Sequence, residues 1–341
     1  MAKHDLASLT QWITAEAQQH GAQLHDRVMA RLGCSRRSAQ NLLRKLEAAQ
    51  WLQRTGIGRK ARYEPGTLRQ VVHRYNLAGL QEDLPWARDF APFFNLPPQV
   101  ARLAQHAFTE LLNNAIDHSG GTQVAVSLRQ TALHLQLLVS DDGCGLFQRL
   151  QQNFGIEDPD LAMLELSKGK LTTAPQAHTG RGLFFSARLA DVCDLHANRQ
   201  AYQFRGWERR SWFRNKALPR QGTSVYLAFA LDTTRTLDNV LRQHSASGQG
   251  YGFDTTQVPL QLVTGLQTGL ESRAQAKRVA TRLEQFKKAE VDFTGVAELG
   301  HAFADELFRV YAQQHPGVQL VPTGMAPRVA AMVESVRETL A

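Results

Sequence analysis

The sequence predicts a multidomain α+β protein, and three observations lead to this fold class. The chain has 341 residues, more than a single domain of about 100–200 residues holds. Segments with apolar residues at helical spacing alternate with segments in which every second residue is apolar. Breaks rich in proline, or in glycine and serine, separate these segments. They predict modules at 1–75, 97–232 and 250–341, with a connector at 76–96.

Composition excludes several classes of protein. Hydrophobic residues make up 43% and charged residues 21% of the chain, as in folded globular proteins. No stretch approaches the roughly 18–20 apolar residues of a membrane span, and the N-terminus lacks a secretory apolar region. Cys34, Cys144 and Cys193 are too scattered for a disulfide framework or a zinc site. We therefore expect a cytoplasmic protein with no membrane partner.

Positive charge is concentrated in the first module. Residues 1–75 contain 13 lysines and arginines but 5 acidic residues, whereas the remaining 266 residues contain 26 of each sign. A basic terminal module on a neutral body is typical of a protein that binds a polyanion. The alternative is a solvated basic face without a partner.

The first module has the pattern of two helices and a hairpin. Leu24–Leu32 predicts a short helix, and Arg36–Ala49 predicts a second helix that Ser35 can cap. Trp51–Thr55 and Ala61–Glu64 predict two strands around a basic, glycine-containing tip.

This order resembles a winged helix-turn-helix domain, which implies DNA as a partner. The second helix would then enter the major groove while the hairpin contacts the backbone. The resemblance implies DNA contacts from eight residues: Arg36, Arg37, Gln40, Asn41, Arg44, Arg59, Lys60 and Arg62. Such folds also serve in dimerisation or protein docking, so a protein partner and a homodimer stay open as alternatives.

Helix and strand patterns continue through the second module. Leu68–Asn76, in the proline-rich stretch before it, predicts a helix. Val124–Leu128 and Leu133–Val139 alternate and predict two paired strands, and Gly222–Phe229 predicts another.

A long predicted helix, Gln99–His118, carries polar residues on one stripe. Glu110, Asn114 and His118 are spaced four residues apart, so a carboxylate, an amide and an imidazole share one face. Alone, this pattern also fits a partly polar surface helix.

Three further motifs indicate a nucleotide site. Asp141–Gly145 follows a hydrophobic strand, where a carboxylate can accept a hydrogen bond from an adenine amino group. His178–Leu183 opens an apolar helix with two glycines, whose amides can bind phosphate. Gly222 and Thr223 open the later strand.

In this order the motifs resemble the GHKL ATP-binding fold, over about residues 97–230. The resemblance implies a mixed sheet with helices on one face, forming a GHKL α/β sandwich, and the cofactors ATP and Mg²⁺. It implies Glu110 as the catalytic base and Asn114 as the metal ligand. The implied cofactor-binding residues are Asn114, Asp117, His118, Asp141, Gly143, Gly145, Lys170, Thr179, Gly180, Arg181, Gly182, Leu183 and Thr223.

The residues between the nucleotide motifs predict a lid. Residues 146–177 form a long loop that is a candidate ligand-ordered switch. We expect Lys170 to sense the γ-phosphate and Lys168 to be a solvated loop charge.

The third module alternates strand and helix patterns. Leu260–Val263 and Ala289–Phe293 predict strands, and Gly300–Gln314 predicts a long helix. The run from Asp292 to Phe308 resembles a small STAS-like α/β domain. Where signalling STAS domains carry a phosphorylated serine, this chain has Ala302, which argues against phosphorylation in cis.

A helix opening at Ser272 has two interpretations. It is either a capped, solvated helix, or an anion or partner site around Arg273, Lys277 and Arg278.

These expectations combine into a transcriptional or signalling regulator. It would couple Mg-ATP binding or hydrolysis to DNA or partner binding. Hydrolysis is favoured over protein kinase activity. A histidine kinase is not expected, since no phosphoacceptor-histidine segment precedes the ATP module. The alternatives are a serine kinase of the anti-sigma type acting in trans, which His118 favours, and a nucleotide-binding scaffold without turnover.

Overall fold

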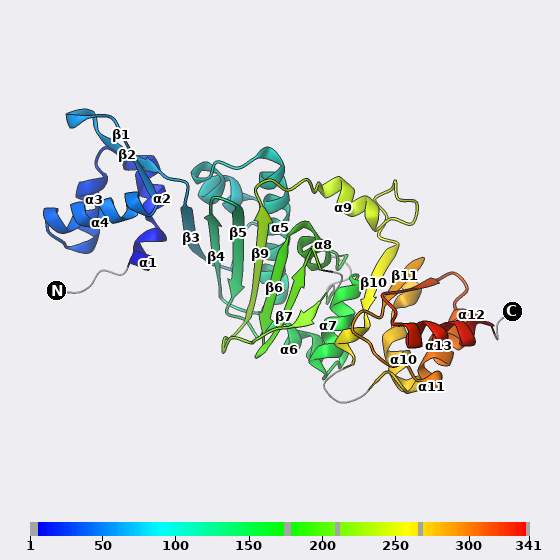
Figure 1. Cartoon of the computed structure of the whole chain (residues 1–341). Coiled ribbons are helices and arrows are strands. Elements are labelled where there is room, and N and C mark those ends of the chain that lie inside the picture. The colour runs from blue at the N-terminus through cyan, green and yellow to red at the C-terminus, as the bar shows by residue number, and fades with distance from the viewer. Residues whose placement is uncertain (1–5, 174–178, 209–211, 265–268, 339–341) are drawn as a thin grey trace.

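The computed structural model describes residues 6–173, 179–208, 212–264 and 269–338, and the backbone alone at Arg59. Within these ranges the strands form three sheets, of two, seven and three strands. The sheets follow one another along an elongated molecule, with the N-terminal module at one end and the C-terminal domain at the other (Figure 1). The predicted multidomain α+β class is confirmed. No helix in the described ranges is long and apolar enough to cross a bilayer.

The N-terminal module packs helices against a hairpin. Its elements are α1 (Leu6–Thr10), α2 (Ile13–His20), α3 (Leu24–Leu32), α4 (Arg36–Ala48), β1 (Leu52–Thr55), η1 (Gly58–Lys60) and β2 (Arg62–Pro65). Ser35 caps α4, because its Oγ accepts a hydrogen bond from the Ser38 amide at 3.3 Å. Ile13, Leu24 and Leu43 belong to a core that is separate from the core of the remaining chain.

The helix predicted at Leu68–Asn76 is wrong. These residues form β3 (Arg69–Asn76), which pairs antiparallel with β4 (Gln123–Gln130). Val71 is 3% exposed, and the rings of His73 and Tyr75 stack 5.8 Å apart. Alternation and strand pairing therefore override the weak helical pattern.

The central sheet has the order β3-β4-β5-β9-β6-β7-β8. Its other strands are β5 (His134–Asp141), β6 (Val192–Ala197), β7 (Gln200–Arg205), β8 (Phe213–Arg214) and β9 (Thr223–Ala230). In the described ranges every neighbouring pair is antiparallel, so the expected mixed sheet is wrong. β5 and β6 point the same way, but β9 lies between them.

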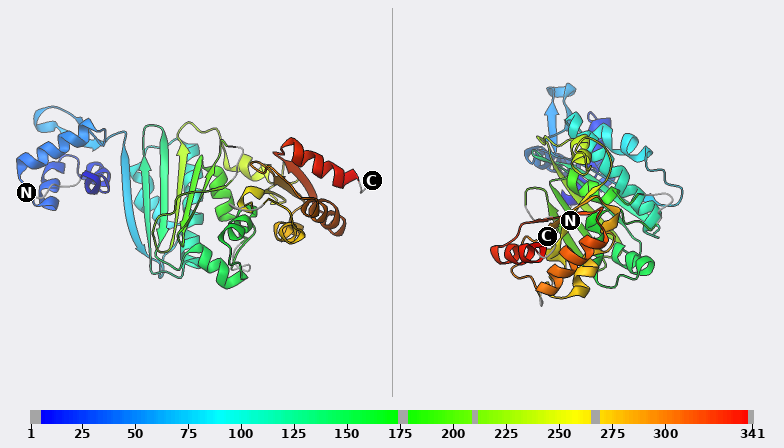
Figure 2. Two further views of the ribbon diagram at one scale, coloured as in Figure 1. Left: turned by 60° about the horizontal axis from the view of Figure 1, so that its bottom comes forward. Right: turned by 90° about the vertical axis from the view of Figure 1, so that its right-hand side faces the viewer.

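Helices cover one face of this sheet (Figures 1 and 2). The layer comprises η2 (Trp86–Phe90), η3 (Ala91–Phe93), α5 (Pro98–His118), α6 (Leu146–Phe154), α7 (Pro159–Lys168) and α8 (Gly182–Leu189). The predicted helix at Gln99–His118 is confirmed as α5, which buries its apolar stripe in the core. Trp86 and Phe90 both pack edge-on against Phe108 of α5, so the connector contributes to this core.

The predicted lid is not a continuous loop, because it contains α6 and α7. Phe147 and Leu150 of α6 are buried, and so are Ala162, Met163 and Leu164 of α7. Apolar burial against neighbouring elements stabilises these helices, which the sequence pattern did not indicate.

The C-terminal domain contains a parallel sheet of β10 (Thr255–Pro259), β11 (Lys288–Asp292) and β12 (Gln319–Thr323). Its other elements are α9 (Leu237–Gln243), η4 (Leu260–Leu262), α10 (Arg273–Ala280), η5 (Leu283–Gln285), α11 (His301–Asp305), η6 (Glu306–Tyr311), α12 (Ala312–Gln314) and α13 (Pro327–Glu338). The strand predicted at Leu260–Val263 is wrong, since the strand ends at Pro259 and η4 follows. Leu260 and Leu262 are buried there without strand pairing.

Candidate functional site

A cavity of about 340 Å³ lies between α5, the lid and the strand ends of the central sheet. This volume is within the range of small-molecule sites. All four sequence motifs contribute to its wall, although they are up to 113 residues apart, from Glu110 to Thr223. The fold thus brings together residues that the sequence separates.

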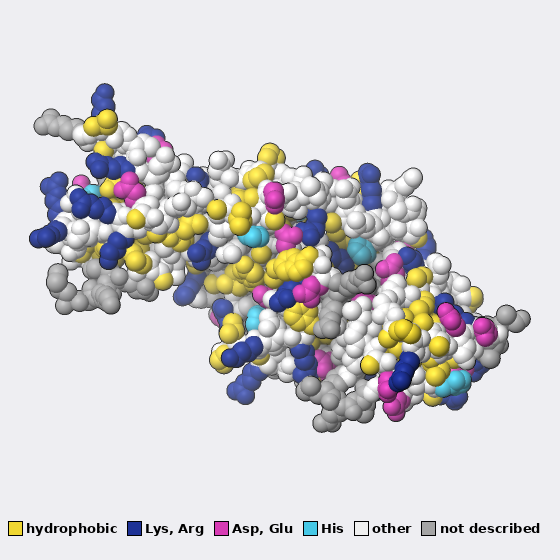
Figure 3. Space-filling view, viewed as in Figure 1, with side chains coloured by type: hydrophobic (Ala, Val, Ile, Leu, Met, Phe, Trp, Pro, Cys, Tyr) yellow, Lys and Arg dark blue, Asp and Glu magenta, His cyan; other side chains and the backbone are white. Residues whose placement is uncertain are grey.

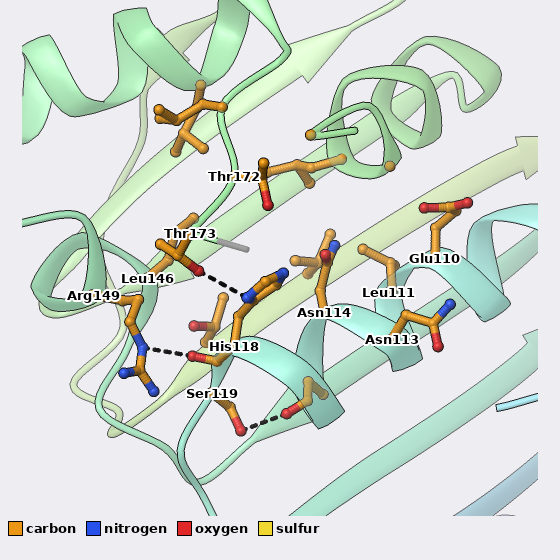
Figure 4. Close-up of a pocket in the computed structure, with 18 of the residues that line it drawn as sticks. Glu110, Leu111, Asn113, Asn114, His118, Ser119, Leu146, Arg149, Thr172 and Thr173 are labelled. Carbon is orange, nitrogen blue, oxygen red and sulfur yellow. Dashed lines mark hydrogen bonds between the residues drawn. The ribbon is translucent and has the colours of Figure 1, made fainter. Parts of the chain in front are cut away.

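Helix α5 supplies the polar floor of the cavity. Glu110, Asn114 and His118 project from successive turns toward the lid segment that carries Thr172 and Thr173 (Figure 4). The stripe therefore lines a cavity, whereas a surface helix would present it to solvent.

Asp141 lies at the end of β5 and is 8% exposed. Its Oδ1 accepts hydrogen bonds from the amides of Gly143, at 2.9 Å, and Thr223, at 3.1 Å. Burial raises the pKa of the Asp141 carboxyl, while these two amides oppose the shift. The contacts fix one carboxylate oxygen, and the residue lines the cavity.

The glycines near Asp141 are required by close packing. A Cβ on Gly222, where φ is +77°, would lie 2.1 Å from the Asp141 carbonyl oxygen. A Cβ on Gly143 would lie 2.2 Å from the Ser119 carbonyl oxygen. Gly143 is not among the residues that line the cavity, so its place in the structure is to join the strand end to α5.

The N-terminus of α8 lies beside Glu110 in the cavity wall. A Cβ on Gly182 would lie 2.3 Å from Glu110 Oε2, so the carboxylate lies against the first turn of the helix. The first amides of a helix have no intrahelical acceptor and favour anions. Five consecutive predicted residues line the cavity here: Thr179, Gly180, Arg181, Gly182 and Leu183.

The lid contributes residues that sequence reasoning missed. The Thr173 hydroxyl lies 2.9 Å from His118 Nδ1, and Arg149 Nε donates to the His118 carbonyl oxygen at 2.8 Å (Figure 4). Arg149 and Thr173 are distant from α5 in sequence, and no motif marks them. Only the folding of the lid over α5 brings these three residues together.

Lys168 and Lys170 are not placed as the sequence analysis expected. Lys168 is 0% exposed, so the expected solvated charge is wrong. Lys170 does not line the cavity, because its Nζ donates to the Gln285 carbonyl oxygen at 2.6 Å and lies 4.2 Å from the Phe286 ring centre.

Asp117 is a further predicted residue that lies apart from the site. It is exposed on α5 and is not part of the cavity wall. Its position one residue before His118 turns it away from the polar stripe. Gly145 does line the cavity, at the start of α6.

The predicted DNA-binding residues gather on the N-terminal module, where Lys and Arg side chains cluster in the space-filling view (Figure 3). Arg62 Nε is paired with Glu64 at 2.8 Å. The Arg59 side chain lies outside the described part of the chain. The remaining predicted residues are exposed on α4 and at the hairpin: Arg36, Arg37, Gln40, Asn41, Arg44 and Lys60.

Arg36, Gln40 and Arg44 also line a cavity of about 340 Å³ in this module, together with Arg54 and Tyr63 of the hairpin. No sequence motif marks Arg54. Packing of the hairpin beside α4 places it there.

In the C-terminal domain, Ser272 caps α10. Its Oγ accepts from the Gln275 amide at 3.2 Å, and the Gln275 side chain accepts from the Ser272 amide at 2.9 Å. This capping box confirms the capping interpretation of Ser272. Arg273 and Lys277 face Asp305 and Glu306, at 3.8 and 3.7 Å.

No group of three or more His, Cys, Asp or Glu side chains forms a metal site within the described ranges. A magnesium ion at Asn114 would therefore take its other ligands from phosphates and water, which is the usual mode for this ion. An amide oxygen beside one carboxylate suits that arrangement.

Comparison with known families agrees with the geometry. Residues 99–233 match the family described as histidine kinase-, DNA gyrase B- and HSP90-like ATPase, and residues 275–330 match a STAS-like domain of unknown function, DUF4325. No curated protein matches the chain. The chain therefore carries a GHKL ATPase domain, followed by a STAS-like domain.

Proposed function

We propose that this chain is a regulator that binds Mg-ATP between α5 and the lid, and couples its binding or hydrolysis to DNA or partner contacts. The observation that carries the proposal is the buried Asp141, held by two amides at one end of a cavity whose other end contains Glu110 and the α8 N-terminus. The buried carboxylate suits the purine, and the free amides at the α8 N-terminus suit the triphosphate.

The residues have distinct chemical tasks in this proposal. The Asp141 oxygen accepts a hydrogen bond from the adenine amino group, and the amides that open α8 bind phosphate. Asn114 would hold Mg²⁺, which would neutralise charge on the phosphates. Glu110 orients the attacking water as general base, since it lies against Gly182 at the phosphate-binding turn.

Nucleotide titration tests the adenine assignment. Asp141→Asn replaces the accepting oxygen pair with an amide, so ATP affinity is expected to fall at least about tenfold, the equivalent of one charged hydrogen bond. Asp117→Asn makes the same change on exposed α5 surface and should leave affinity unaltered. Equal affinity of wild type and Asp141→Asn contradicts the proposal.

DNA binding by the N-terminal module is part of the same proposal. Two observations support it. Residues 1–75 contain 13 basic but 5 acidic residues, and the basic side chains of α4 are exposed. ATP can change DNA affinity only if it binds two arrangements of the protein with different affinity.

A second candidate is a serine kinase acting in trans, favoured by His118 beside Asn114 and Glu110 on one stripe. Incubation with γ-labelled ATP and a lysate separates the two. Label on a protein, lost in Glu110→Ala, supports the kinase, whereas free phosphate supports the ATPase. Tight ATP binding with neither product indicates a nucleotide-binding scaffold.

A further inference from the structure

We propose that Arg282 of the STAS-like domain is a positioning residue for the nucleotide pocket. It holds the end of the lid helix α7, and thereby the pocket wall that follows. This inference rests on the proposed ATP binding and adds the element that controls nucleotide release.

The end of α7 is held by a charged cluster of the buried Glu165 and Lys168 with the half-buried Arg282, which we call the anchor cluster. Lys168 Nζ donates to Glu165 Oε1 at 2.5 Å, and Arg282 Nη1 donates to Glu165 Oε2 at 2.9 Å. Glu165 is 6% exposed and Lys168 is 0% exposed. One carboxylate from the lid thus joins a lid cation to a cation of the STAS-like domain.

Backbone contacts extend the anchor cluster on both sides. Arg282 Nη2 donates to the Gly169 carbonyl oxygen at 2.9 Å, and Lys168 Nζ donates to the Thr281 carbonyl oxygen at 2.8 Å. The buried Thr256 hydroxyl of β10 donates to the Lys168 carbonyl oxygen at 2.7 Å. The carbonyl oxygens at the end of α7 therefore accept hydrogen bonds from side chains of the C-terminal domain.

The turn after α7 is fitted to the same surface. Gly169 has φ +79° and ψ −175°, a conformation that is essentially restricted to glycine. A Cβ at Gly169 would lie 2.5 Å from Phe253 Cζ. Lys170 then continues the contact, because its Nζ bonds to the Gln285 carbonyl oxygen.

The pocket wall begins immediately after these contacts. Leu171, Thr172 and Thr173 line the nucleotide cavity, and Thr173 contacts His118. Each residue spans at most about 3.6 Å of extended chain, so the wall residues, two to four positions from Gly169, stay within about 7–14 Å of it while the anchor cluster is intact. Releasing Arg282 would leave the buried Glu165 carboxylate with one cationic partner fewer. Attachment of the STAS-like domain therefore restrains the lid.

The experiment measures release of a fluorescent ATP analogue from the full-length protein. In Arg282→Met, which keeps the length but removes the donors, we expect dissociation about tenfold faster, because the lid opens more often. In Arg282→Lys, which keeps the charge but not both contacts, we expect an intermediate rate. A purely structural role would lower the melting temperature without changing the release rate.

Arg278→Met is the matched control, since Arg278 is an exposed arginine on α10 of the same domain. It should release nucleotide at the wild-type rate. If Arg282→Met fails to fold, Thr256→Val tests the anchoring of α7 instead, because it removes a single hydrogen bond to the Lys168 carbonyl oxygen. About two- to threefold faster release is expected for that loss.

Two results are distinguishable. If the wild-type protein binds the analogue and folded Arg282→Met releases it at the wild-type rate, the role of Arg282 is overturned and the proposed ATP binding stays intact. If Arg282→Met does not fold, a wild-type release rate in Thr256→Val overturns the anchoring of α7 in the same way. A wild-type protein that does not bind ATP overturns both.

Discussion

Gly169 joins the lid helix to the pocket wall, and its backbone conformation is the reason that no other residue fits. A side chain there would meet backbone strain at φ +79° and also collide with the Phe253 ring. The sequence contains Lys168-Gly169-Lys170, a motif that resembles any polar loop. Only the structure shows that this glycine lies against an aromatic side chain of another domain.

Gly169→Ala is therefore expected to destabilise the protein by about 3–5 kcal/mol, from backbone strain together with overpacking. Gly155→Ala is the comparison variant, at a glycine whose ψ of 20° lies in the left-handed helical region that alanine can adopt. It also has positive φ, +66°, but no atom lies within 4 Å of a Cβ added there. Strain alone should cost that variant about 1–2 kcal/mol. Urea unfolding measures both, and equal losses would contradict the role of Phe253.

At the scale of elements, α5 and the lid helices differ in how far their sequences predict them. The apolar stripe of α5 recurs over 21 residues and predicts both the helix and its polar face. α7 has 10 residues, and its buried set includes Glu165 and Lys168. A short helix with buried charges gives no clear periodicity, so its burial depends on the domain that packs against it.

The α4 helix and the hairpin are the elements that the DNA proposal needs. If α4 and the hairpin tip contact phosphates, Arg37→Ala and Lys60→Ala should each reduce the slope of log affinity against log salt by about 0.9. Arg328→Ala, at an exposed arginine on α13, should leave the slope unchanged. Fluorescence anisotropy with duplex DNA measures the slopes. A slope that neither α4 nor hairpin substitution alters would remove these elements from the interface.

At the scale of the whole molecule, the hydrophobic residues that the structure describes form two separate cores. One core belongs to the N-terminal module, and the other runs continuously from the central sheet into the STAS-like domain. Phe253 lies at that junction, with ring centres 4.5 Å from Phe184 of α8 and 5.4 Å from Phe286. The ATPase and STAS-like domains are therefore expected to unfold together.

Calorimetry of the full chain should show two transitions, one for each core. Leu43→Ala, in the N-terminal core, should lower the temperature of one transition, with a stability loss of about 2–5 kcal/mol. ATP should raise the temperature of the other transition alone, since ligand binding stabilises the unit that binds it. A shift of both transitions by Leu43→Ala would show that the cores are coupled.

Local spacing in the sequence predicts the elements with strong periodicity and the motifs that line the cavity between α5 and the lid. α5, the β4–β5 hairpin and the stripe of Glu110, Asn114 and His118 follow from spacing, because a regular helix or strand converts spacing into a shared face. Contacts between distant segments are needed to see that residues 69–76 form a strand, that Lys168 is buried and that Lys170 faces Gln285. These features depend on partners more than 40 residues away in the sequence, and a local sequence pattern does not identify such partners.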